Sequence, residues 1–282
     1  MSPSAFVWLQ RLLPQRLLGR FIYRLSRSER KWIKSPLVAW FARQYEIDLD
    51  DARVPDLEAY PSFNAFFTRE LRAGARTIDT APDAIVSPVD GRLTEFGALS
   101  DGRLLQAKGF DYALTELIGE TAPGAWSTGS YATAYLSPRD YHRVHMPFPG
   151  TLRRLRYIAG RRYSVNAATA TQIKDLFCRN ERLVCWLDGS IGTFAVVLVG
   201  ALNVASFSTP VTGEIASAGD RAWQDLAPID YAHGDLLATF NLGSTVVLLF
   251  PSGAVEWQSQ LRAGQRITLG HRIGTVRTPV DT

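Results

Sequence analysis

Short apolar runs separated by turn-forming residues fill the chain from about residue 79 onward. Glycine, proline, asparagine and aspartate punctuate these runs, and such residues favour turns between strands. The expected strands are 91–96, 131–136, 151–158, 182–187, 192–198, 202–207, 236–240, 246–250 and 254–257. Strands at this close spacing are typical of an all-β barrel or sandwich core.

Two further segments in this part of the chain carry helical patterns. One covers 63–71 and is closed by Gly74, and the other covers 112–118 and is closed by Gly119. The longest uncharged stretch, 189–213, contains glycine, asparagine and proline between two short β-branched runs. That composition predicts strand, turn and strand in a buried sheet, and it does not suit a bilayer helix.

The N-terminal segment has a different periodicity. Apolar residues recur at helical spacing over 6–25, and Pro14 is expected to break or kink this stretch. A second amphipathic helix is expected to start at Ser35 and Pro36, as cap and first-turn proline. Arginines interrupt both segments, so neither approaches the ~20 apolar residues of a membrane span. The pattern also fits poorly with a signal peptide.

Charge is distributed unevenly. Residues 1–45 hold nine basic side chains and one acidic side chain, whereas the rest holds 22 basic and 26 acidic ones. The basic helices either pack on the protein's own core with solvated arginines, or lie in the plane of an anionic membrane surface. Nucleic acid would also attract arginines, but the leucine-rich and aromatic opposite face favours lipid.

These patterns predict an α+β protein. We expect a predominantly β, barrel- or sandwich-like core and an N-terminal amphipathic helical region. Acidic residues and a proline between 48 and 60 mark the boundary, which gives an amphipathic region over 1–55 and a catalytic domain over 56–282. Cys178 and Cys185 fit neither a redox pair nor a zinc cluster, and the four histidines are not grouped with cysteines. No metal site is expected.

The candidate chemistry centres on Gly243-Ser244-Thr245, which precedes the apolar run 246–250. A glycine carbonyl is unshielded by a Cβ, so the Ser244 hydroxyl can attack it and convert the amide to an ester. Elimination and hydrolysis would then leave a pyruvoyl group, an electron sink that does the work of pyridoxal phosphate. Alone, the tripeptide is more typical of a turn.

Two upstream motifs favour a reactive site over a simple turn. Asp90 lies in Ser-Pro-Val-Asp-Gly, and His142 and His145 lie within the motif 135–147. Aspartate, histidine and serine are the parts of a base-activated nucleophile. Asp90 is also in a sequence that is common in turns. Pro138 and Pro147 disfavour a helix around the two histidines, so we expect an irregular segment that presents them to different tasks.

With these motifs and Leu242 before Gly243, the chain resembles the phosphatidylserine decarboxylases of the bacterial, membrane-associated type with a Leu-Gly-Ser-Thr cleavage sequence. The resemblance runs from Phe-Asn-Ala-Phe-Phe-Thr-Arg at 63–69, through Gln-Ala-Lys-Gly at 106–109 and Ser-Val-Asn at 164–166, to Phe250. It implies self-cleavage between Gly243 and Ser244 into a β chain (1–243) and an α chain (244–282). A pyruvoyl made from Ser244 would then form a Schiff base with phosphatidylserine, and phosphatidylethanolamine and carbon dioxide would be released.

The resemblance also implies roles for individual residues. Asp90, His145 and Ser244 would form the self-cleavage set, and His142 would act in decarboxylation; these two histidine roles are open to exchange. Candidates for the lipid phosphate are Lys108, Arg69 and Arg143, and for Arg143 a structural ion pair explains the residue equally well. Thr245 would donate a hydrogen bond to the oxyanion. The run 110–113, Phe-Asp-Tyr-Ala, departs from the more polar family pattern. His233 and His271 are expected at the surface or in turns.

The implied partners are phosphatidylserine, an anionic membrane surface and the chain's own second fragment, with a dimer of such heterodimers as a further assembly. The implied location is peripheral, on the cytoplasmic side of the cell membrane. Three alternatives stay open at this stage. They are a Ser/His/Asp hydrolase, although Gly-Ser-Thr lacks the nucleophile elbow, a pyruvoyl decarboxylase for a soluble amino acid, and a non-catalytic membrane-binding protein.

Overall fold

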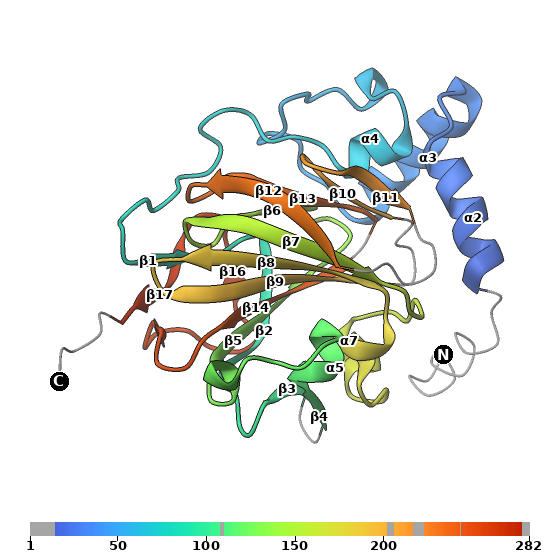
Figure 1. Cartoon of the computed structure of the whole chain (residues 1–282). Coiled ribbons are helices and arrows are strands. Elements are labelled where there is room, and N and C mark those ends of the chain that lie inside the picture. The colour runs from blue at the N-terminus through green and yellow to red at the C-terminus, as the bar shows by residue number, and fades with distance from the viewer. Residues whose placement is uncertain (1–14, 108–109, 202–205, 217–222, 243, 278–282) are drawn as a thin grey trace.

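An open antiparallel sheet of eight strands forms the centre of the molecule (Figure 1). The computed structural model describes residues 15–107, 110–201, 206–216, 223–242 and 244–277. The order across the large sheet is β12 (Gln224–Tyr231), β7 (Gly150–Ile158), β8 (Arg182–Gly189), β9 (Gly192–Gly200), β14 (Ser244–Phe250), β5 (Ser130–Leu136), β2 (Gly91–Ala98) and β16 (Arg266–Ile267). The described residues of the edge strands β12 and β16 do not pair with each other, so the sheet is not a closed barrel.

Three smaller antiparallel sheets accompany the large one. The first is ordered β11 (Gly213–Ala216), β10 (Ser206–Thr209), β13 (Leu236–Asn241) and β6 (Arg143–His145). The second is ordered β1 (Ala84–Val86), β17 (Arg272–Val276) and β15 (Val255–Trp257), and the third pairs β3 (Arg103–Ala107) with β4 (Phe110–Ala113). The chain leaves the first small sheet through β13 and enters the centre of the large sheet through β14.

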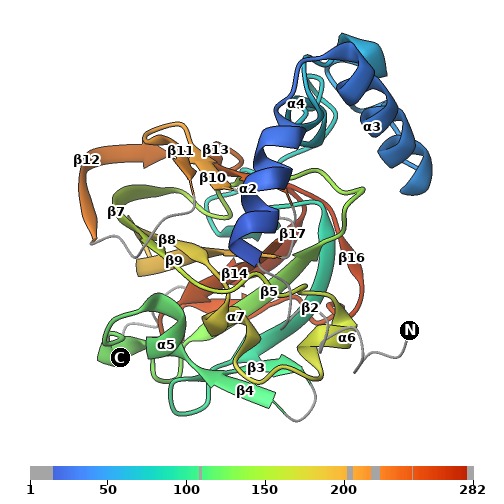
Figure 2. The same cartoon turned by 90° about the vertical axis from the view of Figure 1, so that its right-hand side faces the viewer.

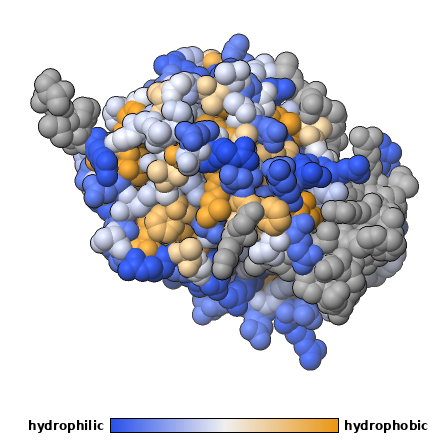
Figure 3. Space-filling model, turned by 90° about the horizontal axis from the view of Figure 1, so that it is seen from below, coloured by the Kyte–Doolittle hydropathy of each residue, from blue (hydrophilic) through white to orange (hydrophobic). Residues whose placement is uncertain are grey.

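Helices are few and mostly short. They are α2 (Gln15–Ser26), α3 (Lys31–Gln44), η1 (Leu57–Ala59), α4 (Phe63–Phe67), α5 (Leu114–Ile118), η2 (Gly124–Trp126), α6 (Ala167–Ala170) and α7 (Leu176–Arg179). Figure 2 shows α3 and α4 at one end of the molecule, above the sheets, while α5, α6 and α7 lie at the opposite end. Figure 3 views that opposite end, where apolar patches interrupt a largely polar surface.

The sequence pattern predicted most of the large sheet, and the mixed α+β class is confirmed. Strands β8, β9 and β14 are buried along nearly their whole length, which explains why they read as continuous apolar runs and not as alternating ones. Residues 202–205 of the predicted strand 202–207 lie outside the described residues, as do residues 1–14 of the first amphipathic segment.

Three helix boundaries were wrong. The helix expected over 112–118 starts at Leu114, because Tyr112 and Ala113 belong to β4. The helix expected over 63–71 ends at Phe67. Thr68 still donates its N–H and its hydroxyl to the Asn64 carbonyl, but the next N–H, of Arg69, donates to Phe66 only three residues back. The helix expected to start at Ser35 starts at Lys31 and contains Pro36. This helix lacks one intrahelical hydrogen bond, because Pro36 has no backbone N–H to donate. Burial of Val38 and Phe41, together with Lys34 donating to the Glu58 and Tyr60 carbonyls, stabilises the longer helix.

Candidate active site

The predicted cleavage sequence lies at the junction between β13 and β14. Gly243 itself lies outside the described residues. Ser244 begins β14, where its backbone faces Leu136 of β5 and Gly200 of β9, and nothing is described of its side chain. Just upstream, Leu242 is buried and has a φ of +90°. A positive φ in a bulky residue other than glycine is a backbone outlier that costs of order 1–3 kcal/mol.

Packing and hydrogen bonds hold this junction from the upstream side. The Leu242 side chain belongs to a cluster with Phe41 of α3 and Phe63, Phe66 and Phe67 of α4. The preceding Asn241 accepts a hydrogen bond from Asn64 and donates to Ser206 and Ser208. The unusual backbone of Leu242 is therefore over-determined by contacts on several elements, which is the condition for strain to persist.

His142 lies directly beside β13. Its carbonyl accepts the Phe240 N–H at 3.0 Å, and its ring lies 4.0 Å from the Phe67 ring, centroid to centroid. The ring is fully buried, and its Nδ1 lies 2.7 Å from the Asp140 carbonyl oxygen. Since a carbonyl can only accept, Nδ1 carries the proton. Burial and the nearby Arg69 charge lower the pKa of His142 to about 3, so the imidazole is neutral near pH 7.

The opposite nitrogen of His142 is the chemically available one. Its Nε2 is buried and has no hydrogen-bond partner among the described residues. A neutral imidazole with a proton on Nδ1 presents a lone pair at Nε2, which can accept a proton or a hydrogen bond. Buried polar atoms without partners are uncommon, so this nitrogen is a candidate contact for a bound or reacting group.

His145 is held differently. Its Nδ1 donates to the Gly234 carbonyl at 2.7 Å, and its Nε2 accepts from the Tyr141 hydroxyl at 3.0 Å, with the two rings stacked. Burial lowers the pKa of His145 and raises that of Tyr141 to about 12, so both groups are neutral near pH 7. His145 therefore has its base nitrogen already engaged by a phenol.

Asp90 and His145 share a backbone link but no side-chain hydrogen bond. The His145 N–H donates to the Pro88 carbonyl, two residues before Asp90. The Asp90 carboxylate binds the Arg76 guanidinium through both oxygens at 2.6–3.1 Å and accepts the Leu269 N–H at 2.8 Å. Asp90 and His145, expected in one self-cleavage set with Ser244, therefore do not contact each other through these two described side chains.

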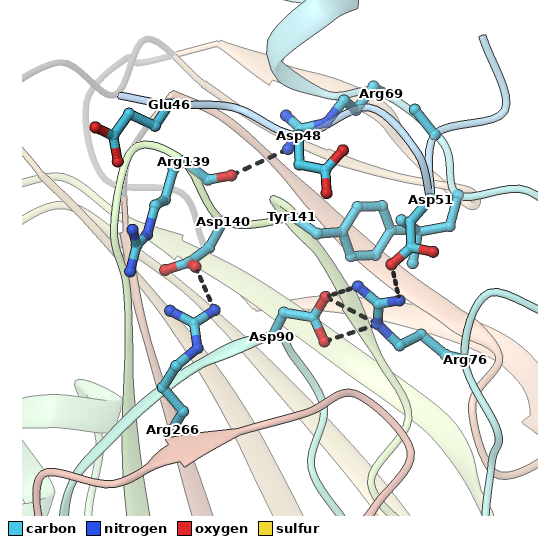
Figure 4. Close-up of a pocket in the computed structure, with 12 residues that line it drawn as sticks. Glu46, Asp48, Asp51, Arg69, Arg76, Asp90, Arg139, Asp140, Tyr141 and Arg266 are labelled. Atoms are coloured by element: carbon cyan, nitrogen blue, oxygen red, sulfur yellow. Dashed lines mark hydrogen bonds and ion pairs between the residues drawn. The ribbon is translucent and has the colours of Figure 1, made fainter. Parts of the chain in front are cut away.

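The surroundings of Asp90 form a charged cavity of about 200 Å³ (Figure 4). Arg76 lies between Asp90 and Asp51, and the two carboxylates raise its pKa. Sequence reasoning missed Arg76, which stands in a loop without any motif.

The glycine of the Asp-Gly motif, Gly91, is required for a steric reason. A Cβ on Gly91 would lie 2.6 Å from the Tyr135 carbonyl oxygen, so only glycine fits as β2 begins.

The predicted phosphate contacts are placed as follows. Lys108 lies outside the described residues. Arg69 is buried and donates to the Arg139 carbonyl (Figure 4), and burial lowers its pKa. Arg143 binds the Thr68 carbonyl and forms a 3.0 Å ion pair with Glu70, the structural alternative considered from sequence. Thr245 is buried, and its Oγ1 has no partner among the described residues.

The remaining chemical groups are accounted for. His271 is exposed in a turn as expected, and the half-buried His233 places its Nε2 2.8 Å from the Ala84 carbonyl oxygen. Cys178 and Cys185 are free thiols whose pKa values are raised by burial to about 12. Among the described residues there is no group of His, Cys, Asp and Glu that could hold a metal ion. No helix in the same part of the chain is long and apolar enough to cross a bilayer.

Comparisons with known proteins place these features in one family. The family model described as phosphatidylserine decarboxylase matches residues 63–275, and a second model, described as PSD, matches residues 5–46. The chain is 45% identical to the phosphatidylserine decarboxylase proenzyme of Ectopseudomonas mendocina, over 98% of this chain and all of that one. Proteins of the same name from Psychrobacter cryohalolentis (42%; 98% of this chain, 100% of the other) and Alcanivorax borkumensis (44%; 97% of each chain) are similarly close. The chain belongs to the phosphatidylserine decarboxylase family.

Proposed function

We propose that this chain is a proenzyme that cuts its own backbone between Gly243 and Ser244 and then decarboxylates phosphatidylserine to phosphatidylethanolamine. The observation that carries the proposal is the junction itself, where a buried Leu242 with a positive φ precedes the Gly-Ser bond. Strain of this kind clusters at reacting sites. The name "proenzyme" carried by the relatives supports the same conclusion.

The proposed cut needs no outside reagent except water. The Ser244 oxygen attacks the Gly243 carbonyl carbon, and the amide becomes an ester as the nitrogen takes up a proton. Loss of a proton from Cα then breaks the bond between Cβ and oxygen, which releases Gly243 as a carboxylate and leaves a dehydroalanine at position 244. Water adds to that residue and ammonia departs, so the 39-residue α chain, 244–282, begins with a pyruvoyl group.

The described residues next to position 244 fit such a group. Thr245 Oγ1 and His142 Nε2 are buried polar atoms without partners in the described structure, and both suit a carbonyl or an amine nearby. The pyruvoyl would supply a carbonyl that combines with the substrate amine and accepts the electrons left when carbon dioxide departs. Thr245 would orient that carbonyl by donating from its hydroxyl.

The two histidines divide the proton transfers in this proposal. His145 removes the Ser244 proton during the cut, which requires its Nε2 to exchange the Tyr141 hydroxyl for that of serine. Asp90 supports this step through its charge, which raises the pKa of His145, and not through a hydrogen bond. His142 Nε2 takes a proton from the substrate ammonium and returns one to the carbon that lost carbon dioxide. Its vacant Nε2 lone pair is free to accept that proton, although its pKa of about 3 makes the imidazole a weak base. The same vacant lone pair also favours the exchanged assignment, in which His142 serves the cut.

The N-terminal helices would bring the enzyme to its lipid. Phe21, Trp32 and Trp40 are 63%, 71% and 57% exposed, and exposed Arg20, Arg24, Arg30, Lys31 and Arg43 lie on the same two helices or at their ends. Aromatic side chains with basic neighbours are typical of peripheral attachment to an anionic surface. We propose that α2 and α3 lie on such a surface, and that the cut enzyme is a heterodimer of its α and β chains.

Carbon dioxide release from phosphatidylserine tests the proposed function. The purified protein should release it in mixed micelles without added metal or cofactor, whereas Ser244→Ala should stay uncut and release none. Ser252→Ala is the matched control, because this exposed serine follows the far end of β14. An uncut chain that hydrolyses esters would favour the serine hydrolase instead, and turnover of free amino acids would favour the soluble-substrate enzyme. Lipid binding without any cut would favour a non-catalytic protein.

A further inference from the structure

A row of paired residues crosses the large sheet at the start of β14. Thr245 faces Tyr135, Tyr135 faces Arg92, and Arg92 faces Arg266. Residues directly paired across antiparallel strands project to the same face of the sheet. Thr245, which follows the proposed cut, therefore shares one face with two arginines. Two strand spacings separate the Thr245 and Arg92 backbones, which is about 10 Å.

A cavity follows this row. Its volume is about 460 Å³, and Thr245, Tyr135 and Arg92 all line it. Apolar side chains such as Val165 and Phe177 form much of the remaining wall. A second cavity of about 490 Å³ shares Arg92 and Tyr135 with the first and adds Arg139 and Arg266. The two cavities therefore share Arg92 and Tyr135 in their walls, and Arg92 lines both the space beside Thr245 and the space beside Arg139 and Arg266.

The charge of this group is only partly matched within the protein. Arg266 forms a 3.0 Å ion pair with the buried Asp140. Among the described residues, neither Arg92 nor Arg139 has an ion-pair partner, and the Arg92 guanidinium donates to the Gly264 carbonyl. Arg92 and Arg266 lie directly opposite each other on neighbouring strands. Like charges in such a pair destabilise it. An anion bound between them would relieve this repulsion.

We propose that Arg92, with Arg139 and Arg266 beside it, binds the phosphate of the phospholipid substrate. The proposal rests on the function proposed above, since it takes phosphatidylserine as the ligand. In that lipid, four bonds separate the reacting amine nitrogen from the phosphorus. After the cut, the amine is held at the group attached to the Thr245 nitrogen. The long Arg92 side chain then covers the rest of the distance along the cavity, and its planar fork matches two phosphate oxygens.

Sequence reasoning did not single out these arginines, because Arg92 and Arg266 lie outside the motifs that carried the family resemblance and Arg139 lies within the motif 135–147, where the two histidines indicated the chemistry. Strand register brings them together from positions 92, 139 and 266. The acidic residue of the first cavity, Glu95, lies three residues beyond Arg92 on the same strand, and burial raises its pKa. A more readily protonated Glu95 opposes an anion less than an ordinary glutamate would.

Binding to the uncut chain tests this inference separately from catalysis. Ser244→Ala keeps the intact chain that the structure describes, and short-chain phosphatidylserine below its micelle concentration is titrated by calorimetry into that variant. In the Ser244→Ala background, the further substitution Arg92→Gln should weaken phosphatidylserine binding about tenfold, because charge-assisted hydrogen bonds are lost. Arg92→Lys should lose less, since it keeps the charge but not the fork. The control Arg153→Gln removes an exposed arginine paired only with Asp188 on distant strands and should leave affinity unchanged.

Short-chain phosphatidylethanolamine separates phosphate from carboxylate recognition, because it keeps the phosphate and lacks the carboxylate. Arg92→Gln should weaken both lipids by the same factor. A loss confined to phosphatidylserine, an unchanged affinity for both lipids, or no binding to the parent Ser244→Ala chain would each overturn the proposal. A wild-type protein that neither cuts nor releases carbon dioxide would overturn the proposed function and leave this binding result standing.

Discussion

Large side chains are buried at and after the β13–β14 junction, whereas several on the N-terminal helices are exposed. β14 runs between β5 and β9, and its residues from Thr245 to Phe250 are at most 2% exposed. On α2 and α3, by contrast, Phe21, Trp32 and Trp40 are more than half exposed. Burial of this kind fixes atoms for chemistry, whereas exposed aromatic side chains are free to meet a surface. The molecule therefore separates a buried junction, the proposed reacting centre, from exposed helices, the proposed contact face.

The two regions nevertheless touch at the reacting centre. Arg27, directly after α2, binds Ser206 and Glu214, and Ser206 in turn accepts from Asn241, two residues before Gly243. Phe41 of α3 packs in the same cluster as Leu242. The inner face of the helices therefore braces the junction while their outer face stays open. If the junction carries out the chemistry and the outer face binds the membrane, substitutions at the junction should change the reaction. Substitutions on the outer face should change only membrane attachment.

The largest expected effect comes from the two histidines. His145→Ala should leave one uncut band on a denaturing gel, because the Ser244 proton has no acceptor. His142→Ala should still give two bands, with the carbon dioxide release rate lowered at least ~100-fold. His271→Ala, an exposed histidine, is the control for both. The reverse pattern of bands would mean that the two roles are exchanged.

The next effect concerns acid stability of the buried centre. The pKa of His142 is about 3 in the native state and 6.5 in a free side chain, so the unfolded chain binds a proton that the native chain does not between these values. Stability should therefore rise with pH through this window and fall as the pH drops from 6.5 toward 3. Replacing His142 with Gln should make the slope shallower by up to ~1.4 kcal/mol per pH unit.

Urea unfolding at pH 7, 5.5 and 4.5 measures that slope. The Ser244→Ala background keeps a single chain, so that unfolding is not complicated by fragment dissociation. Burial lowers the pKa of His145 as well, so part of the slope should remain. An identical slope with and without His142 would show that this imidazole is not buried in its neutral form.

On the outer face, Trp32→Ala and Trp40→Ala should each lower partitioning onto anionic liposomes about tenfold, because an interfacial tryptophan contributes roughly 1.5–3 kcal/mol of apolar burial. Cutting in detergent should stay complete in both variants. Flotation of the wild type and the variants measures partitioning. Unchanged partitioning would show that this face does not contact the bilayer. A loss of cutting would show that the outer face also affects the β13–β14 junction.

The smallest effect isolates the backbone of Leu242. Leu242→Ala and Leu242→Gly both remove the side chain from the aromatic cluster, but only glycine tolerates the positive φ. The glycine variant should therefore be more stable than the alanine variant by about 1 kcal/mol, the reverse of their usual order. It should also cut more slowly, because the strained conformation is no longer enforced. Equal stability and equal rates would show that strain at Leu242 plays no part.

Periodicity and turn residues sufficed to predict most strands of the large sheet, because β8, β9 and β14 are continuous apolar runs with glycine or asparagine at their ends. The exposed edge strand β12 was missed, since it carries charged and polar residues and little apolar pattern. Motifs identified Asp90 and both histidines, which the fold places near one another. They could not identify Arg76, because its contact depends on how a loop folds against the turn at Asp90. Tyr141 lies four residues before His145 in the same motif, but its side chain gave no separate signal of a partner.

Intact-mass analysis of the purified protein, before and after borohydride treatment, tests the central claim most directly. The account predicts two chains of 243 and 39 residues, with the smaller one starting at position 244, lacking a free amine and gaining mass on reduction of its ketone. A single polypeptide of 31.3 kDa that borohydride leaves unchanged would contradict it.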